Sequence, residues 1–346
     1  MSVVTVGRKA IRLMPTAGAA AVLCALAACG GDDEASDGAA PAASKPKEVR
    51  VALFAFTTAN PYGQALIEGA EGAAKESGAK LQVFDGKADL NTQLGQIRDA
   101  TASGNFDAFE IQPVSGAAVV PVVEEAIDAG IKVAAVNGQI GPSATTDEIQ
   151  VPGVSASVLK PASDVGVDMG KMTIDACAGK DPCRAAFIIG LKSLDQDTTV
   201  LKYWQDTVKP AGVELVATQE GQYANDQAYK VAQGILTANK QLDVIVSNAD
   251  QMALGASRAL KEADRTDVKV VGHGASELGV AAVKSGELFG TDTLVPQTEG
   301  ELATKHVIEA VRDGKDAGGL NPVEAGDHPA LITKDNADAF TAQWQG

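Results

Sequence analysis

The sequence predicts an α/β fold made of two Rossmann-like lobes, each a parallel sheet flanked by helices. Short runs that are apolar on both faces alternate with amphipathic stretches of helical period, and the series restarts after an irregular segment from 138 to 160. Strands that are apolar on both faces are typical of parallel sheets covered by helices. With 346 residues, of which 45% are hydrophobic, the chain is long enough for two cores.

The first lobe starts at residue 48. An apolar run over 49–56 predicts a buried strand, and Asn60-Pro61 after it combines an N-cap with proline at the first helical position. This helix stops at Gly78. We expect the lobe to continue with strand 81–84, helix 90–103, strand 108–112, helix 117–129 and strand 132–136.

The second lobe repeats the alternation of strand and helix, and a tail follows it. We expect the second lobe to consist of helix 162–178, strand 184–189, helix 198–208, strand 214–218, helix 226–238, strand 244–247, helix 251–262 and strand 268–271. For the tail we expect a helix over 298–313, the segment 322–332 and a last helix near 336–344.

The N-terminus predicts export and a lipid anchor. A basic start is followed by an apolar, small-residue stretch over 16–28, which is the layout of a secretory signal. Leu26-Ala27-Ala28-Cys29 is the lipobox pattern, so we expect removal of residues 1–28 and lipid on Cys29. The alternative, a transmembrane helix, needs a longer and more strongly apolar stretch. We therefore expect a protein anchored by lipid to the extracytoplasmic face of the cell membrane.

Residues 29–47 predict a flexible tether, since they are small, polar or proline and include no large apolar side chain. The whole chain has a formal charge of −16, and loss of the signal removes three cations and no acids, giving −19. Nucleic acid is excluded as a partner because phosphate contacts need clustered Lys and Arg. We expect a monomer whose negative charge keeps it soluble outside the cell.

Two cysteines remain after Cys24 leaves with the signal and Cys29 takes the lipid. Five residues separate Cys177 from Cys183, and both cysteines would lie in an oxidising compartment. We therefore expect a disulfide between them. No histidine is near them in the sequence, which argues against a metal site. We expect this pair to be structural, and we expect no metal and no cofactor elsewhere.

Polar side chains follow nearly every predicted strand. Ligands of open α/β sheets bind beyond the carboxyl ends of the strands, so these side chains are candidates for binding a small molecule. Asp85 and Asp250 have an alternative role as helix or turn caps, and His273 as a solvated loop residue. Trp204 fits a packing position better than a binding one. The candidate ligand-binding residues are Thr58, Asn60, Tyr62, Asp85, Gln112, Asn137, Gln139, Lys192, Asp195, Tyr223, Asn248, Asp250, His273 and Gln297.

From about 48 to 340 the chain resembles the ribose-type periplasmic sugar-binding proteins, the type I solute receptors of ABC importers. Asn60-Pro61-Tyr62 resembles the family's Asn-Pro-aromatic turn, and Gln112-Pro113 resembles its third strand-to-helix turn. The segment 248–256 resembles the family's Asn-Asp-Glu-Met-Ala-Leu-Gly-Ala, and Val270-Val271-Gly272 ends the following strand as the family does.

The resemblance implies a hinge of three segments between the lobes, near Val151–Ser155, Thr291–Leu294 and Val323–Pro329. The first lobe would then comprise 48–151 plus 295–323, and the second 155–292 plus 329–346. A hinge of this kind closes the lobes over a ligand.

Several positions depart from the family's pentose-binding members. Where those place an acid and an arginine, this chain has Asn137-Gly138, and where they place Phe-Asp it has His273-Gly274. An expected arginine is replaced by Asp197-Thr198, and Ala249 stands where the family's motif has asparagine. Carboxylates and arginines grip neighbouring hydroxyls with charge-assisted bonds. A neutral, moderately polar ligand therefore fits better than ordinary ribose or galactose.

We expect capture of a sugar-like solute outside the membrane and its delivery to an ABC permease complex. The alternative is a sensory receptor that presents its closed form to a membrane kinase or chemoreceptor. The sequence contains no Gly-x-Ser-x-Gly elbow and no phosphate loop, and Glu277 stands where a dinucleotide motif needs its third glycine. His273, His306 and His328 lack metal-ligand spacing. We therefore expect no enzyme activity and no catalytic residue.

Overall fold

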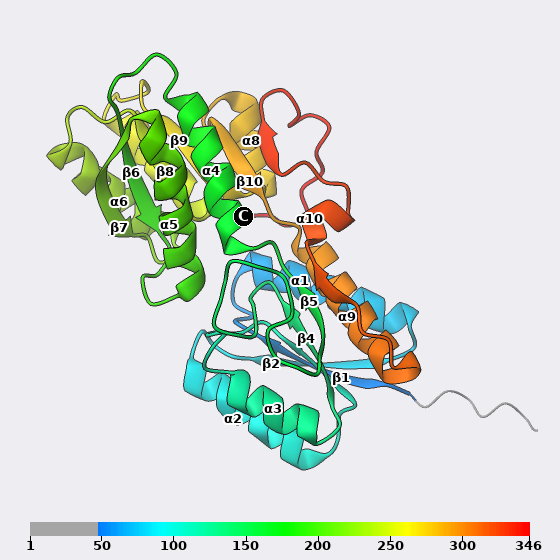
Figure 1. Ribbon diagram of the computed structural model, residues 1–346. Coiled ribbons are helices and arrows are strands. Elements are labelled where there is room, and N and C mark those ends of the chain that lie inside the picture. Colours follow the sequence, from blue (N-terminus) through cyan, green and yellow to red (C-terminus); the bar gives the residue numbers. More distant parts are fainter. Residues whose placement is uncertain (1–47) are drawn as a thin grey trace, which may run out of the picture. The chain divides into compact units, whose positions relative to one another are not determined.

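The structure is a computed structural model that describes residues 48–346 (Figure 1). The expected signal peptide 1–28, the lipid-bearing Cys29 and the tether 29–47 lie outside the described residues. Within 48–346, no helix combines the length and the apolar character that a membrane span requires.

The first sheet contains six parallel strands in the order β11-β5-β4-β3-β1-β2. Helices α1 and α9 cover one face, and α2 and α3 cover the other. The strands are β1 Arg50–Ala55, β2 Lys80–Asp85, β3 Ala108–Ile111, β4 Lys132–Val136, β5 Val154–Val158 and β11 Gly318–Leu320, and the helices are α1 Pro61–Glu76, α2 Leu90–Ser103, α3 Val120–Asp128 and α9 Pro296–Asp313.

The second sheet has the strand order β12-β10-β9-β8-β6-β7, in which only β12 is antiparallel to its neighbour. Helices α4 and α5 cover one face, and α6, α7 and α8 cover the other. The strands are β6 Cys183–Ile189, β7 Val213–Glu220, β8 Val244–Ser247, β9 Lys269–Gly274, β10 Gly290–Thr293 and β12 Leu331–Thr333, and the helices are α4 Ala162–Ala176, α5 Asp195–Val208, α6 Asn225–Ala238, α7 Asp250–Glu262 and α8 Glu277–Ser285, with the short α10 Pro322–Ala325 and the 3₁₀ turn Lys209–Ala211.

The predicted fold class, two parallel-dominant sheets flanked by helices, is confirmed. The chain passes between the sheets at three places: after β5, between β10 and α9, and between β11 and β12. The third place contains the expected segment Val323–Pro329, whereas the second follows Thr293, at the end of the expected Thr291–Leu294. The first differs, because β5 pairs with β4 and the chain leaves the first sheet at 159–161 rather than at Val151–Ser155.

Strand β5 was read as part of an irregular stretch, and two of its five residues are serine. Ser155 and Ser157 are both fully buried, and the Ser157 hydroxyl donates to the side-chain oxygen of Gln139 at 3.2 Å. A polar residue inside a strand hides the apolar run on which the sequence interpretation depends. Strand β10 was expected to be a hinge segment because of the family resemblance, but Thr291 and Asp292 are buried within it.

Two further expectations need correction. Helix α8 follows β9 and was not predicted, although Ser276 caps it by accepting from the Gly279 backbone N–H at 3.0 Å. The expected last helix over 336–344 is wrong, since this segment contains a turn, a bend and irregular backbone but no helix. Its conformation is fixed by tertiary hydrogen bonds, among them the one from the Trp344 indole to the Gly274 carbonyl at 2.8 Å.

The Cys177–Cys183 disulfide is present, with a Cα–Cα distance of 5.7 Å. It joins the end of α4 to the start of β6. Trp204 has the expected packing role, because it is fully buried against Phe187 and its indole N–H donates to the Thr173 hydroxyl at 2.9 Å.

Glycines bring α1 and α9 into close contact. A Cβ atom on Gly69 would lie 2.0 Å from the Gln297 carbonyl oxygen, and a Cβ atom on Gly300 would lie 2.0 Å from the Leu66 carbonyl oxygen. Neither helix could approach the other this closely with a side chain at these positions. The middle of α1 is therefore held against the first turn of α9.

A buried acid lies between the first sheet and α9. Glu110 on β3 is fully buried and accepts a hydrogen bond from the Thr304 hydroxyl, while its second carboxyl oxygen has no partner. Burial raises the pKa of Glu110 to about 8. The folded protein therefore holds a proton that the unfolded chain releases at a lower pH.

The stability of the protein should fall as the pH rises, in part through Glu110. Because its pKa is raised from 4.5 to about 8 in the folded state, its favourable contribution is complete below about pH 4.5 and is lost by about pH 8. We expect Glu110→Gln to remove part of this loss, so that its melting temperature exceeds that of the unsubstituted protein at pH 8.5 but not at pH 5. The difference corresponds to about 1–3 kcal/mol.

The measurement is thermal unfolding followed by circular dichroism across this range. Glu301→Gln, at an exposed position of the same helix as Thr304, is the control and should follow the unsubstituted protein. If the melting temperatures of Glu110→Gln and of the unsubstituted protein change with pH in parallel, Glu110 is ionised in both the folded and the unfolded state, which would contradict the prediction.

Candidate functional site

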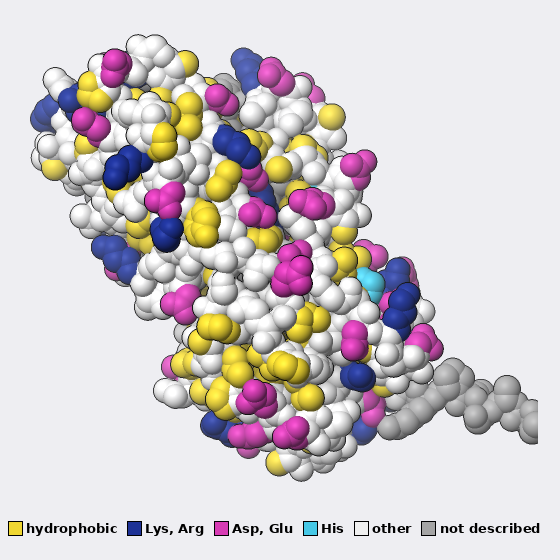
Figure 2. Space-filling model, in the orientation of Figure 1, with side chains coloured by type: hydrophobic (Ala, Val, Ile, Leu, Met, Phe, Trp, Pro, Cys, Tyr) yellow, Lys and Arg dark blue, Asp and Glu magenta, His cyan; other side chains and the backbone are white. Residues whose placement is uncertain are grey.

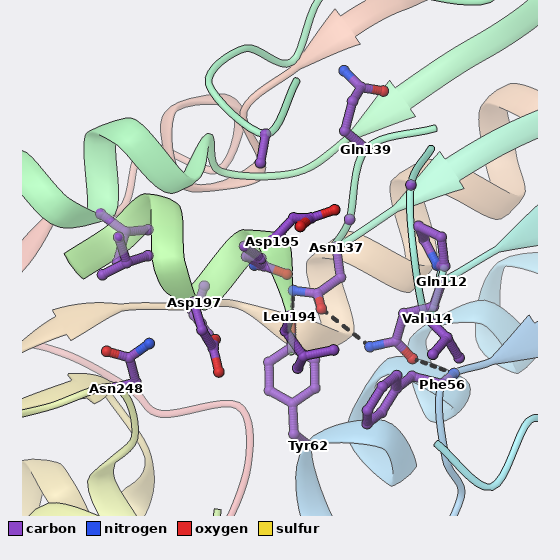
Figure 3. Close-up of a pocket in the computed structure, with 18 of the residues that line it drawn as sticks. Phe56, Tyr62, Gln112, Val114, Asn137, Gln139, Leu194, Asp195, Asp197 and Asn248 are labelled. Carbon is purple, nitrogen blue, oxygen red and sulfur yellow. Dashed lines mark hydrogen bonds between the residues drawn. The ribbon is translucent and has the colours of Figure 1, made fainter. Parts of the chain in front are cut away.

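A cavity lies at the carboxyl ends of the parallel strands, and segments from both sheets line it. It encloses about 170 Å³ of space reachable by water-sized molecules. The polar and aromatic residues that line it are Phe56, Asn60, Tyr62, Gln112, Ser115, Asn137, Gln139, Asp195, Gln196, Asp197, Tyr223, Asn248, Gln251, His273 and Trp344, and many of them are shown in Figure 3.

The first wall, formed by residues of the first sheet and its loops, is built on the start of α1. The Asn60 side chain caps this helix by accepting from the Gly63 backbone N–H at 2.7 Å, and Pro61 occupies its first turn, as predicted. The cap places Tyr62 beside the first turn of α9, where its hydroxyl donates to the carboxylate of Glu299. Glu299 is fully buried and does not line the cavity.

A chain of hydrogen bonds runs through the first wall (Figure 3). The Phe56 backbone N–H donates to Gln112 Oε1 at 2.9 Å, and Gln112 Nε2 donates to Asn137 Oδ1 at 3.1 Å. Asn137 Nδ2 then donates to the Tyr62 hydroxyl at 2.7 Å. These hydrogen bonds fix polar groups directly after strands β1, β3 and β4 and in the first turn of α1.

The second wall, formed by residues of the second sheet and its loops, contains a matching pair. The Tyr223 hydroxyl donates to Asp197 Oδ1 at 2.6 Å, and the Leu191 backbone N–H donates to Asp197 Oδ2 at 2.6 Å. Burial raises the pKa of Asp197, and hydrogen bonds from Tyr223, Leu191 and Asn248 oppose that rise. Burial next to the carboxylate also raises the pKa of Tyr223 well above 10.

His273 connects the second wall to the first crossing segment. Its Nδ1 lies 2.8 Å from Asp292 Oδ2, and the other oxygen of Asp292 is bonded to Lys160. Lys160 also forms an ion pair with Asp168 at 3.0 Å. Since a carboxylate only accepts hydrogen bonds, Nδ1 carries a proton and Nε2 is the acceptor of a neutral ring.

Aromatic rings from both walls border the cavity. Tyr62 and Trp344 meet edge to face, with ring centroids 5.5 Å apart. Phe56 and Tyr223 add two more rings. Aromatic faces of this kind pack against the apolar faces of a small ring or chain while polar side chains bind its edges.

Two lining residues have backbone conformations that favour glycine. Asn137 has φ 59° and Tyr223 has φ 54°, both in the left-handed region. Non-glycine residues in this region are uncommon, and they persist where the surroundings hold them, often at binding sites. The Asn137 side chain is hydrogen-bonded within the first wall and the Tyr223 hydroxyl within the second, which marks these loops as positions where the fold holds polar groups toward the cavity.

The lining of the cavity is polar and carries few charges. Asp195 and Asp197 are its acidic residues, and no lysine or arginine is found among the described residues that line it. Within 48–346, no group of His, Cys, Asp and Glu side chains is arranged to hold a metal ion. On the face of the molecule seen in Figure 2, acidic and basic side chains are interspersed.

The structure brings most of the predicted site residues to this cavity. They are Asn60, Tyr62, Gln112, Asn137, Gln139, Asp195, Tyr223, Asn248 and His273. Gln139 is nevertheless occupied by the protein, since its side-chain nitrogen donates to the carbonyls of Thr146 and Glu148 and its oxygen accepts from the Ile140 N–H. In Figure 3 it points away from the other labelled polar side chains.

Five predicted residues do not line the cavity. Asp250 is fully buried and accepts from Ser276 and from the Thr291 hydroxyl, so it joins the start of α7 to the neighbouring strands rather than capping that helix. Asp85 accepts from the Thr58 and Lys87 backbone N–H groups in a turn, which was its alternative role. The exposed Lys192 donates its backbone N–H to Glu220, and Gln297 contacts Glu68 on α1.

Sequence reasoning missed Phe56, Asp197 and Trp344 as lining residues and Glu299 behind them. Asp197 had been noted only as the replacement of an arginine, and Trp344 had been placed in a helix. Glu299 could have been noticed as an acid on the apolar side of an amphipathic helix, three residues after Pro296.

A family model described as a periplasmic binding protein domain matches residues 51–316. The chain belongs to this family. The xylitol-binding protein of Mycolicibacterium smegmatis is 30% identical over 331 residues, which cover 93% of this chain and 85% of that protein. The D-ribose/D-allose-binding protein of Pseudomonas aeruginosa is 28% identical over 255 residues, covering 72% of this chain and 78% of that protein.

A solved structure agrees with this membership. It is an ABC transporter solute binding protein from Mycobacterium smegmatis with bound glycerol, and it superposes with a TM-score of 0.74 at 25% identity, covering 86% of this chain and 99% of that chain. The predicted resemblance to type I periplasmic binding proteins is thus confirmed, together with the fold that it implied.

The second wall of this periplasmic binding protein should be sensitive to one added methyl group. A Cβ atom on Gly190 would lie 2.4 Å from the Tyr223 ring and 2.5 Å from Asp197 Oδ2. We expect Gly190→Ala to displace both side chains and to weaken binding of the tightest sugar or polyol at least about tenfold, the loss of one or two hydrogen bonds. Isothermal titration calorimetry measures this loss.

Gly72→Ala is the matched control, because a Cβ atom there meets nothing within 4 Å. It should bind as the unsubstituted protein does. Equal affinities for Gly190→Ala and Gly72→Ala would remove the Tyr223–Asp197 pair from the binding site.

Proposed function

We propose that this periplasmic binding protein captures a neutral polyhydroxylated molecule, a sugar or a polyol, outside the membrane and delivers it to an ABC transporter. The observation that carries the proposal is the lining of the cavity: amide, hydroxyl and aromatic groups from both walls, two acids, and no lysine or arginine among the described residues. Hydroxyl groups both donate and accept, which suits such a lining.

The names of the similar proteins support the ligand class. Xylitol is the ligand in the name of one relative and D-ribose and D-allose are those of another, while glycerol is bound in the similar solved structure. All are uncharged compounds with several hydroxyl groups. We propose binding without chemical conversion, since capture and release are what a receptor of a transporter requires.

We also propose that Cys29 is lipidated and that residues 29–47 form a tether to the extracytoplasmic face of the membrane. The lipobox pattern Leu26-Ala27-Ala28-Cys29 supports this proposal. A tether of this composition and of about 18 residues spans roughly 20–25 Å, enough for a receptor to reach a permease in the same membrane.

A panel of compounds tests the proposed ligand class. For the protein without residues 1–29, we expect xylitol, D-ribose, D-allose, glycerol or myo-inositol to raise the melting temperature. A ligand at 100 times its Kd adds about 2.7 kcal/mol of stability, a shift of several degrees. D-glucuronate is the control and should give no shift, because its carboxylate would face Asp195 and Asp197 without a cation.

Mass spectrometry of the small molecules that stay bound through purification extends the panel to compounds outside it. An anionic ligand among them, or a shift with D-glucuronate alone, would contradict the proposed class.

Ligand should also bring the two lobes together. The chain crosses between the sheets at three places, and these crossings can act as a hinge. We expect the compound that gives the largest thermal shift to reduce the radius of gyration in solution scattering. Asp197→Ala at the same concentration is the control and should scatter as the unliganded protein does. Identical curves with and without ligand would argue against closure.

A further inference from the structure

The hydrogen-bond chain of the first wall has one direction, and its two ends determine that direction. A backbone N–H can only donate, so Gln112 must turn its oxygen toward Phe56. At the other end, an ionised carboxylate can only accept, so the Tyr62 hydroxyl must donate to Glu299. Between these ends, Gln112 donates to Asn137 and Asn137 donates to Tyr62.

The direction determines what the first wall offers to a ligand. The oxygen atoms of Gln112 and Asn137 each already accept a hydrogen bond, and one N–H of each amide is already used. The second N–H of the Gln112 amide is not used in this chain, whereas the Asn137 amide also contacts Glu299. Gln112 and Asn137 line the cavity together with Asn60 and Ser115, so the first wall presents amide and hydroxyl donors to a ligand.

Glu299 contacts Tyr62 and Asn137, the last two members of the chain. It is fully buried, does not line the cavity, and its second carboxyl oxygen has no partner within the described residues. The glycines that hold α1 against α9 bring it to Tyr62. An acid buried here costs stability unless it is paired, so its presence points to a role.

We infer that Glu299 is a positioning residue: it accepts the Tyr62 hydroxyl proton, so that the Tyr62 oxygen stays the acceptor of Asn137 at the end of the Phe56–Gln112–Asn137–Tyr62 chain and the first wall donates hydrogen bonds to the ligand. The inference deepens the proposed function and rests on it for the identity of the ligand class. Glu299 itself does not touch the ligand.

The second wall has the opposite character. When it is ionised, Asp197 can only accept, and Nδ1 of His273 is held by Asp292. A ligand is therefore oriented across the cavity, with oxygen lone pairs toward Gln112 and Asn137 and hydroxyl protons toward Asp197. A polyhydroxylated compound satisfies both walls at once.

The protonation of Glu299 should change this arrangement. Burial raises the pKa of Glu299 to about 7, and hydrogen bonds from Tyr62 and Asn137 oppose the rise. Tyr62 on α1 is the ionisable group in contact with it, and within the described residues no Lys, Arg or His is bonded to it. Below the pKa, Glu299 carries its own proton, and Tyr62 is no longer obliged to donate.

The first experiment needs no ligand. The side-chain amide resonances of Asn137 and Gln112 are followed by ¹H–¹⁵N NMR from pH 5.5 to 8.5, with assignments from Asn137→Asp and Gln112→Glu. We expect both to shift with a midpoint near pH 7 in the unsubstituted protein and in the control Glu301→Gln, and to lose that shift in Glu299→Gln. Resonances that do not respond to pH, or respond equally in Glu299→Gln, would overturn the inference.

The second experiment measures affinity for xylitol by calorimetry. Glu299→Gln should weaken binding at least tenfold at pH 8, whereas at pH 5.5, where Glu299 is protonated, the two proteins should bind within about twofold of each other. A purely structural defect would weaken binding equally at both values, and that result would contradict the inference.

Tyr62→Phe keeps the test decisive if Glu299→Gln does not fold. It removes the hydroxyl that is bonded to both Asn137 and Glu299, so the shift of the Asn137 and Gln112 resonances near pH 7 should be reduced. If that shift persists undiminished, Glu299 does not act through the chain. If the NMR result holds while no sugar or polyol binds, the proposed function fails and the positioning role stands.

Discussion

Each wall of the cavity depends on a buried carboxylate that accepts the hydroxyl proton of a tyrosine. Glu299 accepts from Tyr62 in the first wall, and Asp197 accepts from Tyr223 in the second. An ionised acid can only accept, so in each wall the tyrosine hydroxyl must donate to it and the tyrosine oxygen is left to accept. The same interaction has opposite results in the two walls, because Glu299 lies behind the surface and leaves amide donors in front, whereas Asp197 lines the cavity itself.

The fold explains why these groups meet. Parallel strands end at the same edge of a sheet, and each strand end supplies a side chain to the loop that follows it. Close contact between α1 and α9, which glycines permit, places an acid from the end of the chain next to a tyrosine from its beginning. The chain crosses from β10 of the second sheet directly into α9 of the first lobe. Glu299, which supports the first wall, therefore comes from the segment just after this crossing.

Local patterns were enough to predict the fold class, most elements and the cavity side chains that come directly after strands, such as Asn137 and Asn248. They failed where a residue's role depends on distant partners. The serines of β5 and the acid of β10 look like loop residues until their buried partners are known. Asp250 was expected at the site because its segment resembles a binding motif, yet its carboxylate is used by Ser276 and Thr291. Glu299 is far in sequence from Tyr62, so no local pattern indicated their contact.

The most direct test of this account is a crystal structure of the protein with its small molecule bound. We expect one uncharged molecule in the cavity, with oxygen atoms within hydrogen-bond distance of Gln112 Nε2 or Asn137 Nδ2 and hydroxyl groups bonded to Asp197, while Tyr62 still contacts Glu299. A molecule bound outside the cavity, or a Tyr62 turned away from Glu299 in the complex, would contradict the account.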